Sequence, residues 1–189
     1  MQLLARKTTA HHTIATLAAL TLSIGSLPVQ PTEARNAPPT RVQVKIENLA
    51  PQQGTFQTPF WVGFHNGEFD TYDGGTPASN DPRPGSVAME RLCEDGNTAP
   101  ITLDFADLSA GVDATLAGVA GPIAPGETVS QSFLLDPSNP DTRYFSYASM
   151  ILPSNDFCIS NGNPLAHQIF DDSGNFVAQN FFVTGDETL

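Results

Sequence analysis

The stretch YASMILPSNDFCISN, from Tyr147 to Asn161, is the part of this 189-residue sequence that says most about its fold. A hydrophobic run enters a Pro-Ser-Asn-Asp turn and leaves as a second apolar run, which predicts two strands that meet at one end of a sheet. Asp156 stands in that turn. A carboxylate there serves either as a turn former or as a ligand for a hard cation, and the residues leave both roles open.

Working outward from this stretch, the chain shows β periodicity on both sides. Residues 41–47 (RVQVKIE) alternate strictly and place Val42, Val44 and Ile46 on one face, as in a half-buried strand. Residues 60–64 (FWVGF) form a continuous apolar run, as expected of a strand covered on both faces. Further strands are expected at 128–135, 143–152, 166–170 and 175–183.

Turn residues separate these runs. Asp171-Asp-Ser-Gly lies between the last two expected strands and predicts a hairpin. One short helix is expected from Ser86 to Glu94, with Ser86 capping its start and Gly96 just past its end. The expected fold class is therefore all-β, a single antiparallel sandwich with one short helix.

The N-terminal segment predicts export. Two basic residues precede an apolar run at residues 14–27, which is shorter than the roughly 20 residues of a membrane span. Small residues follow at 32 and 34, so residues 1–34 are expected to be a cleaved signal peptide, with an uncleaved membrane anchor as the alternative. The mature protein would then consist of a disordered arm (35–40) and one domain (41–189) in a secreted, extracytoplasmic location.

The charge balance excludes two classes of partner. Removing residues 1–34 takes away two of 8 basic residues and one of 20 acidic residues, so the mature chain carries 6 basic and 19 acidic side chains, a net charge of −13. Binding to nucleic acid or to anionic lipid requires clustered Lys and Arg, which this chain lacks. The acidic excess is explained either by solubility or by binding of divalent cations.

Six segments, in their order and spacing, resemble the spondin domain family, in particular its short secreted microbial members. They are NLAP (48–51), PFWVGFHNGEFDTYDGGTPAS (59–79), MERLCEDGNTAP (89–100), PGE (125–127), SMILPSND (149–156) and NPLAHQIFD (163–171). The resemblance covers nearly all of the expected mature chain. It implies a C2-like antiparallel β-sandwich with a role in adhesion or matrix contact, supported by calcium.

The resemblance also implies metal ligands. Asp156 matches the metal-binding Asp of the family's Pro-Ser-x-Asp turn, whereas the later Asp-Ala-Gly-Thr-Asp/Glu motif does not occur; residues 184–189 (TGDETL) stand about where it should begin. We expect either a truncated chain or a member that has lost half of the site. One Asp supplies few of the 6–8 oxygens that calcium takes.

Two other acidic clusters are alternative ligand sets. Glu68, Asp70 and Asp73 share one expected loop, and Asp171 opens the turn at 171–175. The turn lacks the Asp-x-Asp-x-Asp-Gly order of a calcium loop, so ordinary turn chemistry also explains its residues.

The two cysteines, Cys93 and Cys158, are expected to form a disulfide, because an even pair in an oxidising compartment usually does so. The alternative is that both are small buried hydrophobic residues.

No catalytic motif is present in the sequence. A hydrolase would have to use His65 with Asp70 or Asp73 and a serine such as Ser149, and no spacing selects that set. We therefore expect a protein that is not an enzyme: a secreted module that binds or adheres to an extracellular protein or glycan, with calcium support. The alternative is an ion-independent structural component of the cell envelope or extracellular matrix.

Overall fold

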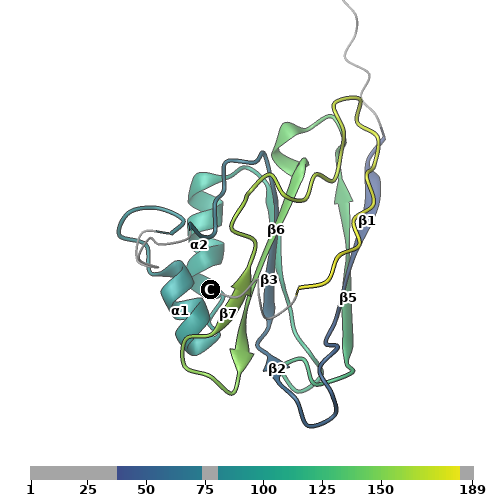
Figure 1. Cartoon of the computed structure of the whole chain (residues 1–189). Coiled ribbons are helices and arrows are strands. Elements are labelled where there is room, and N and C mark those ends of the chain that lie inside the picture. The colour runs from purple at the N-terminus through teal and green to yellow at the C-terminus, as the bar shows by residue number, and fades with distance from the viewer. Residues whose placement is uncertain (1–37, 74–80, 184–189) are drawn as a thin grey trace, which may run out of the picture. The chain divides into compact units, whose positions relative to one another are not determined.

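The strands of the computed structural model form two antiparallel sheets, shown in Figure 1. The structure describes residues 38–73 and 81–183, which belong to one compact unit, and the predicted signal peptide (1–34) lies outside them. The first sheet pairs β1 (Thr40–Glu47) with β5 (Thr128–Leu135). The second sheet contains β2 (Phe56–Gln57), β3 (Phe60–His65), β4 (Val112–Leu116), β6 (Tyr144–Leu152) and β7 (Cys158–Ser160).

β6 is the central strand of the second sheet. Its residue Ala148 pairs with Trp61 of β3 and with Ser160 of β7, so these two strands lie on opposite edges of β6. β4 extends the sheet beyond β3, and a short 3₁₀ turn, η2 (Pro140–Thr142), precedes β6. The two strands expected around the Pro-Ser-Asn-Asp turn are thus present as β6 and β7.

β3 is covered on both faces, as its continuous apolar sequence predicts. Phe60, Val62 and Phe64 belong to the core between the two sheets. Trp61 belongs to a second core, between the larger sheet and the helices, and its indole N–H donates to Asp113 Oδ2 at 2.9 Å. Gly63 allows this packing, because a Cβ there would lie 2.6 Å from the Trp61 ring.

Two helices, α1 (Ala88–Asp95) and α2 (Ala99–Leu108), cover the outer face of the larger sheet (Figure 1). The sequence predicted one helix, at 86–94. α1 confirms a helix in this segment, and Gly96 ends it at φ 65°. The helix starts two residues later than predicted, with Val87 as its N-cap residue; Ser86, one residue earlier, accepts a hydrogen bond from the Ala88 N–H through its Oγ at 3.0 Å.

The prediction of a single helix was wrong, because it missed α2. The β-branched Ile101 and Thr102 weaken the helical signal at the start of α2, whereas Pro100 in its first turn is compatible with a helix. Burial of Ile101 and Phe105 in the second core stabilises the helix instead.

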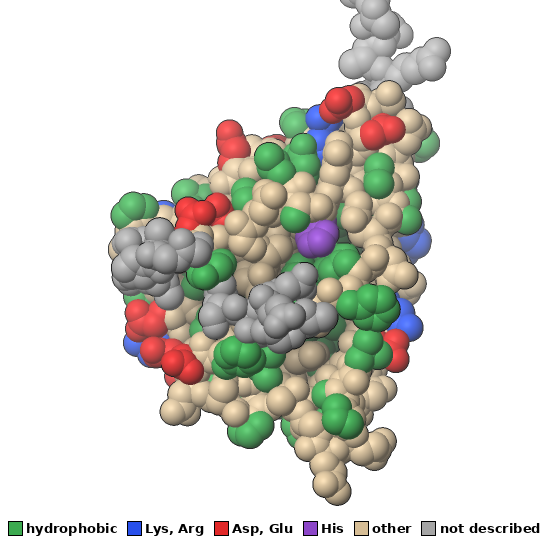
Figure 2. All heavy atoms as spheres, in the orientation of Figure 1, with side chains coloured by type: hydrophobic (Ala, Val, Ile, Leu, Met, Phe, Trp, Pro, Cys, Tyr) green, Lys and Arg blue, Asp and Glu red, His purple; other side chains and the backbone are tan. Residues whose placement is uncertain are grey.

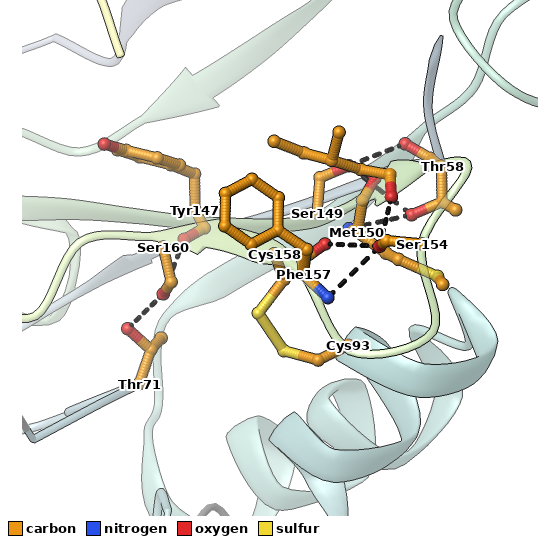
Figure 3. Close-up of a disulfide and its surroundings, with 11 residues drawn as sticks. Thr58, Thr71, Cys93, Tyr147, Ser149, Met150, Ser154, Phe157, Cys158 and Ser160 are labelled. Carbon is orange, nitrogen blue, oxygen red and sulfur yellow. Dashed lines mark hydrogen bonds between the residues drawn. A yellow bond between two sulfur atoms is a disulfide. The ribbon is translucent and has the colours of Figure 1, made fainter. Parts of the chain in front are cut away.

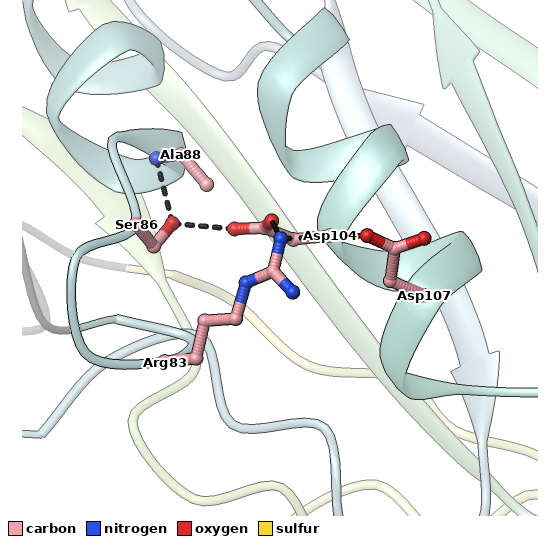
Figure 4. A network of polar contacts seen from close by, with 5 residues as sticks. All are labelled: Arg83, Ser86, Ala88, Asp104 and Asp107. Carbon is pink, nitrogen blue, oxygen red and sulfur yellow. Dashed lines mark hydrogen bonds and ion pairs between the residues drawn. The ribbon is translucent and has the colours of Figure 1, made fainter.

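A polar network joins the two helices (Figure 4). Asp104 of α2 is buried; it accepts hydrogen bonds from Ser86 Oγ and from Arg83 Nη2, the latter at 2.5 Å. Arg83 also pairs with Asp107 at 3.4 Å. The segment before α1 is thereby held to the side of α2.

The expected all-β sandwich is present, with local differences. β1 starts at Thr40, which pairs with Leu135. Thr40, the last residue of the arm expected at 35–40, therefore belongs to the strand. The expected hairpin of 166–170 with 175–183 is reduced to one isolated bridge, between Phe170 and Phe176. The aromatic residues after 175 pack against the open side of the sandwich and do not extend a strand. No helix in the described parts of the chain is long and apolar enough to span a membrane.

Candidate binding cleft between the two sheets

The predicted metal ligand, Asp156, is exposed in the turn between β6 and β7 and makes no hydrogen bond or ion pair with the described residues. Ser154 holds the turn instead. Its hydroxyl donates to the Ile151 carbonyl at 2.5 Å and accepts the Phe157 N–H at 3.1 Å. The turn-forming role expected of Asp156 therefore falls to Ser154.

The other acidic candidates are engaged in local hydrogen bonds. Asp70 Oδ1 accepts the Tyr72 N–H at 3.2 Å, and burial raises the pKa of its carboxyl group. Glu68 accepts from the Asn66 side chain at 2.8 Å. Asp171 accepts from the Asn175 side chain and from two backbone N–H groups of its turn; the Asn175 side chain contributes most to lowering its pKa.

The candidate acidic residues in the described parts of the chain do not come together in one cluster. Within residues 38–73 and 81–183, no group of three or more His, Cys, Asp or Glu side chains is placed to hold a metal ion. Calcium requires 6–8 oxygen ligands, and neither Asp156 nor the Asp171 turn assembles them.

His65 is buried in a network without a carboxylate. Its Nδ1 accepts the Gly67 N–H at 3.0 Å, so Nε2 carries the proton in the neutral ring and donates to Ser146 Oγ at 2.8 Å. Burial lowers the pKa of His65 to about 4. Ser149, the serine considered for a hydrolase, donates to the Thr58 carbonyl at 2.9 Å. The hydrogen bonds of His65 therefore join it neither to Ser149 nor to Asp70 or Asp73.

The cysteines form the predicted disulfide. Cys93 of α1 and Cys158 of β7 are bonded, with their Cα atoms 5.2 Å apart, in the core between the helices and the larger sheet. Figure 3 shows this bond close to the hydrogen bonds by which Thr58 holds β6. The covalent link fixes α1 to the strand that follows the Asp156 turn.

A cleft of about 610 Å³ lies on the other side of the larger sheet, between it and β1. Its volume is within the range of about 300–1,000 Å³ typical of ligand pockets. One wall is the apolar face of β1 predicted by the alternation of 41–47, with Val42, Val44 and Ile46. The opposite wall comes from the larger sheet: Phe60, Phe64, Phe145, Tyr147, Ile151 and Ile159.

The cleft is open because β1 is an edge strand. β1 pairs with β5 along one edge, and no strand in the described ranges pairs with its other edge. The cleft is lined by every residue from Val42 to Ala50, which places its opening along that edge. On the face of the molecule in Figure 2, hydrophobic side chains gather beside a hollow in the surface.

Aromatic residues of the C-terminal segment border this opening. Phe181 stacks on His167, with ring centroids 4.0 Å apart, and on Tyr147 at 5.5 Å. Phe182 also lines the cleft and is 69% exposed. Between its strands the sandwich thus has an apolar interior that remains in contact with solvent.

Amide side chains also line the cleft: Gln179 and Asn180 precede Phe181, and Asn48 and Gln57 lie where β1 ends. Asn48 lies there with its side chain fully engaged: Nδ2 donates to the Thr55 and Ile123 carbonyls, and Oδ1 accepts the Ala50 N–H. Gln57 of β2 lies beside it, because its backbone pairs with Ile123. The Gln57 side-chain oxygen Oε1 is buried and has no hydrogen-bond partner in the part of the chain that the structure describes.

Sequence reasoning did not identify this cleft. The alternation in 41–47 indicated an inward-facing apolar surface but did not indicate that the opposite wall would leave it unfilled. Nothing in the sequence distinguishes Gln57 from the neighbouring Gln52 and Gln53. No protein-family model matches the chain, and no curated protein matches its sequence.

Proposed function

We propose that this protein is a secreted, non-enzymatic binding module that holds the apolar part of its ligand in the cleft between β1 and the larger sheet. The observation that carries the proposal is the solvent-accessible cleft of about 610 Å³ with apolar and aromatic walls. The resemblance to secreted spondin domains and the Cys93–Cys158 disulfide support an extracytoplasmic location.

The cleft favours a binding role over a purely structural one. Protein interiors are packed to a density of about 0.75, and unfilled volume lowers stability. A sandwich that served only as a building block would gain stability from larger side chains on β1, where the chain instead has two valines, Val42 and Val44. Glu47 is the one carboxylate among the described residues that line the cleft, and the proposed binding of an apolar group does not require an ion there.

The test is a titration of the oxidised, secreted protein with N-phenyl-1-naphthylamine, an uncharged apolar dye that fluoresces when it leaves water. We expect saturable binding. Val44→Trp places a large ring in the cleft and should weaken binding at least tenfold. The matched control is Leu134→Trp, on the same two-stranded sheet at a position that is 67% exposed and does not line the cleft.

Leu134→Trp should bind the dye within twofold of the original protein. Circular dichroism should show that both variants keep the β fold. The proposal fails if the dye does not bind saturably, or if a folded Val44→Trp variant binds it as well as Leu134→Trp does.

A further inference from the structure

One edge of β1 is available to another strand. β1 pairs with β5 along its other edge, and no backbone hydrogen bond joins it to the C-terminal segment or to any further residue within 38–73 and 81–183. The strand is regular over residues 40–47, without proline, glycine or a bulge. An unpaired edge of this kind presents a row of N–H and C=O groups that can bind a second strand.

The two faces of β1 differ in polarity. The inner face, toward the cleft, carries Val42, Val44 and Ile46. The outer face is exposed and carries Arg41, Gln43, Lys45 and Glu47. Residues directly opposite each other in an antiparallel pair lie on the same face of the sheet, so a docked strand must alternate in step with β1.

We infer that the strand that docks on this edge is β1 of a second copy of the protein. The two strands run antiparallel, with the two-fold axis at Val44. On the inner face Val42 then lies opposite Ile46 of the second copy, and Val44 lies opposite its own counterpart. On the outer face Arg41 lies opposite Glu47 of the second copy, and symmetry repeats this ion pair.

The charges favour this register over its neighbours. A shift by one residue places apolar side chains opposite polar ones. An axis at Gln43 places Arg41 opposite Lys45 twice, and an axis at Lys45 places two lysines opposite each other, which is destabilising. Charged side chains usually protect an edge strand from pairing, whereas here they oppose the neighbouring registers and stabilise one.

Both members of the proposed ion pair can change partners at little cost. Arg41 forms no ion pair with the residues that the structure describes. Glu47 pairs with Lys45 at 3.4 Å, and their side chains are 46% and 60% exposed, so solvent screens that interaction.

The pairing produces a four-stranded sheet with the order β5-β1-β1-β5. The inner faces of both copies lie on the same side of this sheet, so their clefts open toward each other. Leu49, Phe176 and Phe182 line the cleft and are 63%, 49% and 69% exposed, and the second copy shields this apolar surface from water. The inference goes beyond the proposed function and does not depend on it.

Sedimentation equilibrium of the oxidised, secreted protein over a concentration series tests the inference, and we expect a reversible equilibrium between monomer and dimer. Arg41→Glu replaces both ion pairs by pairs of like charge and should weaken dimerisation at least about tenfold. Glu47→Arg should weaken it similarly, although this change makes the chain less acidic. The double variant Arg41→Glu, Glu47→Arg restores both ion pairs in the opposite sense and should dimerise about as tightly as the original protein.

The matched control is Arg91→Glu, which makes the same charge change on the exposed surface of α1 and should leave the dimerisation constant nearly unchanged. Circular dichroism should show that every variant keeps the native fold. A protein that stays monomeric at every concentration overturns the inference. So does a dimer that Arg41→Glu does not weaken, or that the double variant does not restore.

The outcomes separate this inference from the proposed function. Saturable dye binding by a protein that stays monomeric removes the inference and leaves the binding cleft in place. A dimer that shows the expected response to charge reversal but binds no dye supports the pairing of β1 and removes the proposed function alone.

Discussion

Replacing Cys93 and Cys158 together by alanine should lower the free energy of unfolding by about 4 kcal/mol. The two residues are 65 positions apart, so the bond closes a long loop and restricts the unfolded chain strongly. In the chain-entropy relation, a loop of this length contributes about 4 kcal/mol at 25 °C. For a domain of about 150 residues, this corresponds to a fall in Tm of roughly 10 °C.

Urea unfolding followed by tryptophan fluorescence is a suitable assay. Trp61 is the only tryptophan, is fully buried and belongs to the same core as both cysteines, so its emission reports whether the helices remain packed on the sheet. The double alanine variant should keep the native emission in buffer and unfold at a lower urea concentration.

The reduced original protein is the matched control, because it keeps both sulfur atoms and lacks only the bond. It should lose nearly as much stability as the double alanine variant. If both preparations unfold within about 1 kcal/mol of the oxidised protein, the loop-closure argument is refuted for this fold. Two free thiols in the unreduced protein would show that the bond does not form at all.

Three further changes test other parts of the structure. Burial lowers the pKa of His65 to about 4, against 6.5 when the side chain is exposed. As the pH falls, the unfolded chain therefore takes up the proton before the folded protein does. The free energy of unfolding is unaffected by His65 above pH 6.5 and decreases as the pH falls from 6.5 toward 4. Urea unfolding at pH 7 and pH 5 should show a loss of about 2 kcal/mol that is absent in His65→Asn, and an equal loss in both proteins would contradict it. Ser154→Ala should lower Tm measurably because it removes the hydrogen bonds of the β6–β7 turn, while Asp156→Ala should have the Tm of the original protein. A larger fall in Tm for Asp156→Ala than for Ser154→Ala would show that Asp156 stabilises the turn. Arg83→Met should cost about 1–2 kcal/mol by leaving a buried carboxylate with one partner fewer, whereas Arg91→Met, at an exposed ion pair, should leave the unfolding midpoint nearly unchanged.

The sequence predicted those strands whose burial pattern can be read from residues next to one another in the chain. The alternation in 41–47 became β1, with Val42 buried and Arg41 and Gln43 exposed, and the apolar run at 60–64 became a strand covered on both faces. Gly96 ends α1 because the residue after the helix adopts a left-handed backbone conformation, which glycine takes without steric cost. The disulfide was predicted from the expected compartment and the even number of cysteines, which require no knowledge of the fold.

Features that depend on residues far apart in the chain were missed. α2 forms although the β-branched Ile101 and Thr102 weaken its local signal, because the larger sheet offers a surface on which Ile101 and Phe105 are buried. The segment at 175–183 has a strand-like composition, yet its Phe181 stacks on His167 and Tyr147 and makes no ladder. In both cases the free energy of tertiary packing exceeds the local preference.

Local periodicity and turn chemistry thus determined the strands, the first helix and the all-β class, since each depends on side chains a few positions apart. The candidate site arose only from the tertiary structure. The distance at which the second sheet packs decides whether the apolar face of β1 is covered. Groups far away in the chain, such as Ile123, 66 positions after Gln57, decide whether Gln57 Oε1 has a hydrogen-bond partner. A volume between two sheets and an unused hydrogen-bond acceptor belong to the packed arrangement, so no stretch of sequence carries their signal.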